Sequence, residues 1–164
     1  MKSLFINTSS FFMSIAILEN GIVLYKKEEE FLVDMASKII PEIELSFENV
    51  PFGLTDIDKI FVVNGPGSFT GIRVGVTVAK IIGWAMKKDI IPLSSLELLA
   101  TTPIASENII SAIDARRGSV FAGVYDKDLN IIMPDQYISL NELNKLVNIY
   151  KMSRQNVQKI LKSI

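Results

Sequence analysis

The chain has 164 residues, of which 49% are apolar and 21% are charged, and its formal net charge is −1. This balance is typical of a globular protein with one domain, or with one domain and part of a second. The chain contains no cysteine and no histidine, which excludes disulfides, thiol catalysis, Cys-ligated zinc and any Ser–His catalytic pair.

No targeting or membrane segment is evident. Residues 1–7 reach the polar Asn7 too early for a signal-peptide core. The most apolar run, residues 74–86, contains Lys80 and is shorter than the roughly 20 residues of a membrane span. The near-neutral charge argues against broad electrostatic capture of nucleic acid. We therefore expect a cytoplasmic protein with no membrane contact.

The chain is expected to open with three strands, over residues 4–6, 13–18 and 22–25. Asn20-Gly21 between the second and third strands is a strong hairpin signal, because both central positions of the turn favour positive φ. The opening segment is therefore predicted to be an antiparallel meander.

An acidic helix is predicted over residues 30–48. Apolar residues recur there at every fourth position, at Phe31, Met35, Ile39 and Ile43. Pro41 is expected to kink this helix or to split it in two.

Strands and helices then alternate up to residue 104. A strand over residues 59–63 leads through a glycine-rich turn into a helix over residues 70–88. A strand over residues 90–93 follows, and the segment Ser94-Ser95-Leu96-Glu97 begins a short capped helix. A meander followed by this alternation predicts an α/β fold, with a mixed sheet flanked by helices.

The pattern restarts after Pro103. Strands are expected over residues 109–113, 120–125 and 131–138, the last interrupted by Pro134, and helices over residues 139–150 and 153–164. We place the domain boundary near residue 104, which gives an N-terminal lobe over residues 1–104 and a short C-terminal lobe over residues 105–164.

Charge is unevenly spread along the chain. Residues 28–58 carry nine acids and one base, Lys38, whereas residues 143–164 carry five bases and no acid. One interpretation is a solvated acidic face and a basic terminal helix. The alternative is direct contact between the basic tail and RNA phosphates.

The glycine-rich turn is the most informative stretch. Its residues are Asn64, Gly65, Pro66, Gly67, Ser68, Phe69, Thr70 and Gly71, with Arg73 just beyond. It is not a P-loop, because no Gly-Lys-Ser/Thr follows the glycines, and it lacks the third glycine of a dinucleotide fingerprint. Two interpretations remain open: a nest of backbone N–H groups that binds an anion at the helix N-terminus, or a tight, well-capped turn.

Small residues recur at every fourth position of the helix that follows. They are Gly67, Gly71, Gly75, Ala79 and Gly83. An interior glycine costs about 1 kcal/mol relative to alanine, so this ridge requires a backbone that packs closely against it. That neighbour is either the protein's own sheet or a partner.

A helical wheel indicates that the helix has two apolar neighbours, and we favour a partner subunit as one of them. Arg73, Lys80 and Lys87 form one stripe beside Thr77 and Trp84, and most of the remaining circumference is apolar. This wide apolar arc leaves a second neighbour to be found, either another helix of the fold or a partner subunit. Exposed Trp and Arg are typical interface anchors. The predicted partner interface comprises Gly75, Ala79, Lys80, Gly83, Trp84 and Met35.

Several motifs resemble those of the TsaB (YeaZ) family. The longest runs from Gly65 to Gly75. Shorter agreements, in the same order and spacing, are Asn7-Thr8-Ser9, Ser37-Lys38-Ile39-Ile40-Pro41, Ser94-Ser95-Leu96-Glu97 and Ile113-Asp114-Ala115-Arg116-Arg117-Gly118. The resemblance spans about residues 1–126 and implies an actin-like (ASKHA, ribonuclease H-like) fold, here with an abbreviated second lobe.

The resemblance also implies a function in making threonylcarbamoyladenosine beside the tRNA anticodon. In that family the protein is a non-catalytic partner of a paralogous transferase, TsaD, which holds ATP and a metal, and the two pair through helices of their N-terminal lobes. A small ATPase, TsaE, joins them, and tRNA binds only through the complex. We accordingly expect no catalytic residue, cofactor or metal site of its own, with Asn7, Thr8 and Ser9 forming a vestigial phosphate loop. Whether a homodimer forms without the partner is left open.

Two residues depart from the family pattern. Asn7 stands where the family usually has Asp, and an amide does not supply the charge that a hard cation prefers. Met35 stands where a His is frequent.

The alternative function is an actin-like phosphotransferase or ATPase that uses the loop over residues 65–71, with Asp114 as the best metal ligand. A zinc peptidase would need carboxylate ligands alone.

Overall fold

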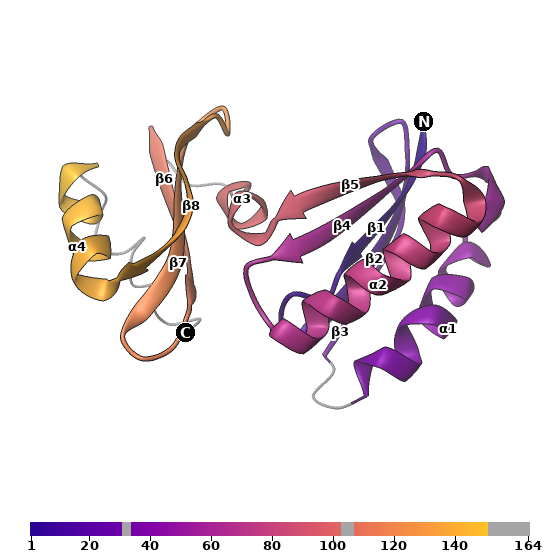
Figure 1. The fold of residues 1–164 in the computed structure, drawn as a ribbon. Helices are drawn as coiled ribbons and strands as arrows, with labels where there is room; N and C mark the ends of the chain where they lie inside the picture. Colours follow the sequence, from indigo (N-terminus) through magenta and orange to yellow (C-terminus); the bar gives the residue numbers. More distant parts are fainter. Residues whose placement is uncertain (31–33, 103–106, 151–164) are drawn as a thin grey trace. The chain divides into compact units, whose positions relative to one another are not determined.

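The structure is a computed structural model that describes residues 1–30, 34–102 and 107–150 (Figure 1). Contacts divide the chain into two compact units, Met1–Leu93 and Ser94–Ile164. Each unit has a hydrophobic core of its own.

A five-stranded mixed sheet forms the first unit. Its strands are β1 (Lys2–Asn7), β2 (Phe12–Glu19), β3 (Ile22–Glu30), β4 (Lys59–Gly65) and β5 (Asp89–Ser94). Their order across the sheet is β3-β2-β1-β4-β5. The strands β1, β2 and β3 form the predicted antiparallel meander, and β1 pairs with β4 in parallel. Asn20 and Gly21 have φ values of 52° and 82°, which confirms the hairpin turn.

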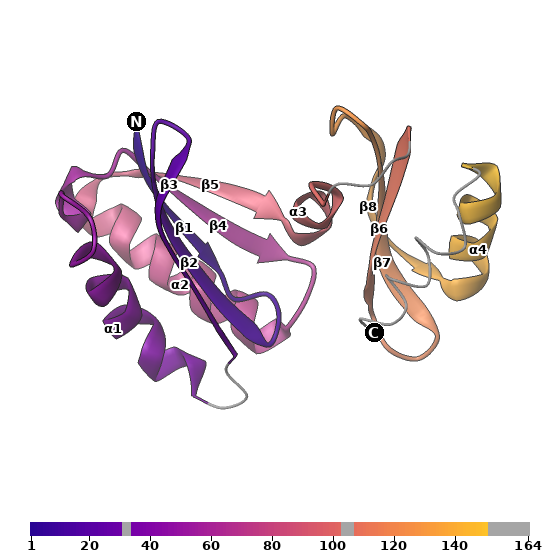
Figure 2. The ribbon, with the colours of Figure 1, turned by 180° about the vertical axis from the view of Figure 1, so that it is seen from behind.

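Two helices lie side by side on one face of this sheet, α1 (Met35–Phe47) and α2 (Phe69–Met86), as Figures 1 and 2 show from opposite sides. A short 3₁₀ helix, η1 (Leu54–Asp56), precedes β4. The core between helices and sheet is built from alternate strand residues, such as Leu4, Ile6, Ile60 and Val62, and from Ile39 and Ile43 of α1. This is the predicted helix-covered mixed sheet.

The acidic stretch folds differently from the prediction at its start. β3 continues to Glu30, beyond the expected end at residue 25, and α1 begins at Met35. The extension is held by pairing with β2 and by Lys27, whose ammonium group lies 3.0 Å from Glu29 and 2.5 Å from Glu42 of α1. Residues 31–33 lie outside the described part of the chain. Pro41 does not split α1, which runs through it as one helix.

The second unit begins with α3 (Ser95–Ala100) and continues with a three-stranded antiparallel sheet and a helix. These are β6 (Asn108–Asp114), β7 (Ser119–Asp126), β8 (Ile131–Ser139) and α4 (Leu140–Ile149). Ser94 caps α3 as predicted, since its Oγ accepts from the N–H groups of Leu96 and Glu97. The predicted helix over residues 153–164 lies outside the described residues.

The boundary between the units lies between Leu93 and Ser94, about ten residues before the predicted position near 104. The physical reason is α3, whose Leu96 and Ala100 are buried together with Ile109 and Tyr125. A short helix therefore joins the core that follows it rather than the sheet that precedes it.

Pro134 lies in β8, an edge strand, at an irregularity in the pairing. Ala122 pairs with Gln136 and Val124 with Met133, so Pro134 and Asp135 both lie opposite Gly123. Proline is tolerated at such a bulge because it has no ladder hydrogen bond to lose there.

Candidate functional site: the glycine loop and the outer face of α2

The glycine loop connects β4 to α2 and is closed by its own hydrogen bonds. Gly65 and Gly67 have φ values of 113° and 156°, which favour glycine. Ser68 is the N-cap of α2, and its Oγ accepts from the Gly71 N–H at 3.3 Å. This confirms the predicted capped turn.

The structure brings this loop against Thr8 and Ser9, at the end of β1. A Cβ on Gly67 would overlap the carbonyl oxygen of Ser9, and one on Gly71 would overlap that of Thr8. The Ser68 N–H donates to the Ser9 carbonyl at 2.7 Å, and the Thr8 hydroxyl donates to the Gly71 carbonyl at 2.7 Å. The missing side chains therefore let α2 dock on the turn after β1.

Of the two interpretations of the loop, this geometry supports the tight turn. Carbonyl oxygens, which carry partial negative charge, occupy the space that the glycines leave at the N-terminus of α2. Asn7 uses its side-chain oxygen to accept from Ser9, from the N–H at 3.0 Å and from the hydroxyl at 2.8 Å. The Ser68 N–H, one of the donors that an anion nest would use, is already paired with the Ser9 carbonyl.

The glycine ridge of α2 faces the protein's own sheet, so the prediction that it meets a partner is wrong. Gly75, Ala79 and Gly83 are all buried. A Cβ on Gly75 would overlap Thr8 Oγ1, Ala79 belongs to the core, and a Cβ on Gly83 would lie 2.7 Å from Ile90. Met35, also predicted at the interface, is half-buried and packs against the same core.

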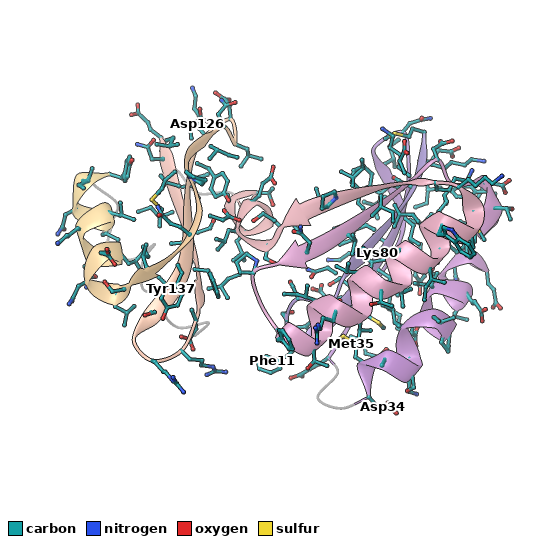
Figure 3. The ribbon with its side chains drawn as sticks, viewed as in Figure 1. Phe11, Asp34, Met35, Lys80, Asp126 and Tyr137 are labelled. Atoms are coloured by element: carbon teal, nitrogen blue, oxygen red, sulfur yellow. The ribbon has the colours of Figure 1, made fainter. Side chains whose placement is uncertain are left out.

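The opposite face of α2 is exposed, as the helical wheel predicts. Arg73, Thr77, Lys80 and Trp84 are all exposed, and Trp84 retains 85% of its surface. Figure 3 labels Lys80 on α2 and Met35 near the start of α1. The Arg73 guanidinium lies 4.4 Å from the centre of the Phe69 ring, an arrangement typical of a cation–π contact.

Further apolar side chains on this helical layer were not among the predicted interface residues. Phe69 is 73% exposed and Ile81 is 56% exposed on α2, while Ile40 and Leu45 of α1 are 49% and 44% exposed. The position of Ile81 beside the Arg73–Trp84 stripe on the wheel is the signal that identifies it. We call the set of exposed residues Phe69, Arg73, Thr77, Lys80, Ile81 and Trp84 the outer face of α2.

By length and composition alone, α2 is also apolar enough to cross a membrane. One such helix is weak evidence for a membrane span, and the glycine ridge of α2 is buried against the protein's own sheet.

Asp114, the candidate metal ligand of the alternative function, organises a turn. Its Oδ1 accepts from the Arg116 N–H at 2.8 Å, and its Oδ2 lies 3.4 Å from the Arg116 guanidinium. Within residues 1–30, 34–102 and 107–150, no three acidic side chains are grouped so as to hold a metal ion.

Comparison with known proteins gives the family. The model of the family TsaD, tRNA N6-adenosine threonylcarbamoyltransferase, matches residues 34–163. The chain is 35% identical over 144 residues to the tRNA threonylcarbamoyladenosine biosynthesis protein TsaB of Bacillus subtilis (strain 168), covering 85% of this chain and 63% of that protein. The chain thus spans less than two thirds of that relative.

Solved structures agree with the sequence comparison. The structure of YeaZ from Pseudomonas aeruginosa matches with a TM-score of 0.73 and 25% identity, over 85% of this chain and 67% of that one. A P. aeruginosa protein described as similar to the peptidase YEAZ matches with a TM-score of 0.78 and 24% identity, over 84% and 66% of the two chains. These likenesses confirm the predicted actin-like α/β class, and together with the sequence matches they lead to one conclusion: the chain belongs to the TsaB (YeaZ) family.

Proposed function

We propose that this protein is a non-catalytic subunit that pairs with a TsaD-like paralogue and supports threonylcarbamoyl transfer to the adenosine beside the tRNA anticodon. The observation that carries the proposal is the outer face of α2, where Trp84, Phe69 and Ile81 are exposed together beside Arg73 and Lys80. Aromatic residues and arginine are enriched among the anchors of protein interfaces.

The match to the TsaD family model supports a paralogue as the partner. Proteins of one family share a fold, so a TsaD-like chain would present its own helical layer over the corresponding sheet. Two related layers can then pair about a pseudo-two-fold axis, in the manner of an isologous dimer. The same reasoning supports a homodimer of this chain when the paralogue is absent.

The closed glycine loop supports the non-catalytic assignment. The carbonyl groups of Thr8 and Ser9 pack against Gly71 and Gly67 at the start of α2, and Asn7 supplies no carboxylate. In our proposal the paralogue therefore holds ATP and the metal, a TsaE-like ATPase joins the pair, and tRNA binds to the assembly in the cytoplasm. No observation favours the alternative phosphotransferase.

Reconstitution of the reaction tests this function. The chain, its paralogue and the ATPase are purified separately and mixed with tRNA, ATP and a threonylcarbamoyl donor, and modified adenosine is quantified by mass spectrometry. We expect no product from this chain alone and a strong increase when it is added to the paralogue. Product formed by this chain without the paralogue, or no effect of adding it, would contradict the proposal.

A further inference from the structure

The β6–β7 turn holds two arginines in a backbone conformation that arginine rarely adopts. Arg116 and Arg117 have φ values of 68° and 54°, and Gly118 follows with 74°. The Ser119 N–H donates to the Arg116 carbonyl at 3.2 Å, so Arg117 and Gly118 are the central residues of a hairpin turn with positive φ. Such turns favour Asn-Gly, Asp-Gly or Gly-Gly. The backbone alone therefore favours other residues at positions 116 and 117.

The chain contains a second turn that serves as an internal comparison. The β2–β3 turn has the same pair of positive φ values, and there the central residues are Asn20 and Gly21. Both turns have glycine at the second central position, and they differ at the first, where one has the favoured asparagine and the other has Arg117. A residue that persists in a strained conformation points to a requirement other than folding.

Contacts within the second unit do not account for the two arginine side chains. Arg116, Arg117 and Gly118 are all exposed. Asp114 fixes Arg116 through its backbone N–H at 2.8 Å and its guanidinium at 3.4 Å, which leaves the other guanidinium N–H groups directed to solvent. Among the described residues Arg117 forms no ion pair.

We infer that Arg116 and Arg117 contact phosphate groups of the RNA backbone when the assembly binds tRNA. The inference rests on the proposed function, which supplies the RNA. The planar guanidinium group matches a phosphate in a two-bond arrangement, and its charge is permanent. Phosphate contacts of this kind position a nucleic acid without reading its sequence.

The composition of the turn favours RNA over a protein partner. A protein interface has an apolar centre surrounded by polar residues, whereas the exposed tip of this turn consists of two arginines and a glycine. The chain as a whole carries a net charge of −1, so these residues contribute to tRNA binding by the assembly rather than capturing RNA alone.

The test uses the full chain in complex with its paralogue and measures two quantities, the Tm of this chain and the Kd of the complex for tRNA. The double variant Arg116→Asn, Arg117→Asn removes both charges and supplies residues that suit the backbone. We expect its Tm to rise by a few degrees while tRNA affinity falls roughly tenfold, and the slope of log K against log salt concentration to flatten by about 2. Arg116→Lys, Arg117→Lys keeps both charges but not the two-bond geometry, so it is expected to lose less affinity than the double Asn variant and to leave the salt slope unchanged.

Asn20→Arg, at the other turn, is the matched control. It introduces the same strain where no RNA contact is proposed, and it removes the hydrogen bond that the Asn20 side-chain oxygen accepts from the Met1 amino group, so it should lower the Tm without changing tRNA affinity. A lower Tm in the double Asn variant would show that the arginines support the fold, and unchanged tRNA affinity in that variant would remove the phosphate contact; either result overturns the inference. Loss of pairing with the paralogue would assign the turn to a protein interface and overturn it too. A wild-type complex with no measurable tRNA affinity would overturn the proposed function as well.

Discussion

At the scale of single residues, the glycines of the TsaB motif have a steric function in this chain. The sequence singles out the loop but leaves two explanations open, because an anion nest and a tight turn require the same residue types. The structure separates them, since Gly67 and Gly71 are the points at which the carbonyl groups of Ser9 and Thr8 approach α2. No pattern in the sequence specifies that long-range contact.

A substitution at Gly71 tests this steric function. A methyl group at Gly71 would overlap the Thr8 carbonyl, so Gly71→Ala should lower the free energy of unfolding by about 3 kcal/mol, through displaced backbone. Gly53→Ala is the control, because its nearest neighbour would lie 3.8 Å away. Urea unfolding measures both. Equal stability of the two variants would contradict the close approach.

Tyr125 provides a second test, through pH. Burial raises the pKa of its hydroxyl, and a hydrogen bond to Asp135 at 2.6 Å raises that pKa further. Since the folded-state pKa lies above the unfolded value of 10.0, the stabilisation is fully present below pH 10 and is lost as the pH rises above it.

Tyr125→Phe should therefore lower the free energy of unfolding by about 1 kcal/mol at pH 7. The free energy of unfolding of the variant should also fall less steeply than that of the wild type as the pH rises above 10. Urea unfolding at pH 7 and at a pH above 10 gives the comparison. Some loss remains in the variant, because the ion pair with Glu42 raises the pKa of Lys27 in the same direction. An unaltered pH dependence would show that Tyr125 is not protected in the folded state.

At the scale of secondary structure, periodicity predicts which residues share a face but not which face points inward. The helix over residues 70–88 and its exposed stripe were predicted correctly, whereas the ridge of Gly75, Ala79 and Gly83 was assigned to the wrong neighbour. Both a sheet and a partner can approach a face without side chains, so the sequence does not choose between them. A bulky substitution at Gly75 consequently tests the fold and not the interface.

The acidic segment illustrates a second limit. Residues 26–30 are all charged and carry no apolar periodicity, so their pattern does not predict an element, and cross-strand pairing with β2 makes them a strand. Alternating side chains are then held by Lys27 with Glu42 on one face and by Lys26 with Glu28 on the other.

Pro41 gives a prediction for α1. Proline in a helix interior lacks the N–H that would bond to the carbonyl four residues earlier, here that of Ser37. Pro41 is exposed, so Pro41→Ala should raise the free energy of unfolding by about 2 kcal/mol, the helical gain being partly offset by the greater freedom of the unfolded chain. Thermal unfolding followed by circular dichroism measures this change. A lower Tm would mean that the proline ring contributes packing that alanine lacks.

At the scale of the molecule, the chain consists of two units with separate cores, and only the first carries the proposed partner surface. The sequence predicts two parts but misplaces the boundary, because the propensity of a six-residue helix says nothing about which core buries its apolar side. On the outer face of α2 the apolar side chains of Phe69, Ile81 and Trp84 remain exposed although the sheet covers the opposite side of the helix, and this exposed apolar surface is the basis for proposing a partner.

The affinity between this chain and its paralogue, measured by isothermal titration calorimetry, tests this claim most directly. Trp84→Glu places a charge on the most exposed aromatic residue of the outer face, and we predict that the Kd rises at least about 30-fold while the Tm of the isolated chain is unchanged, because Trp84 is 85% exposed. Ile131→Glu, at a residue 64% exposed on β8, should leave the Kd unchanged. An unaltered Kd for Trp84→Glu would contradict the account.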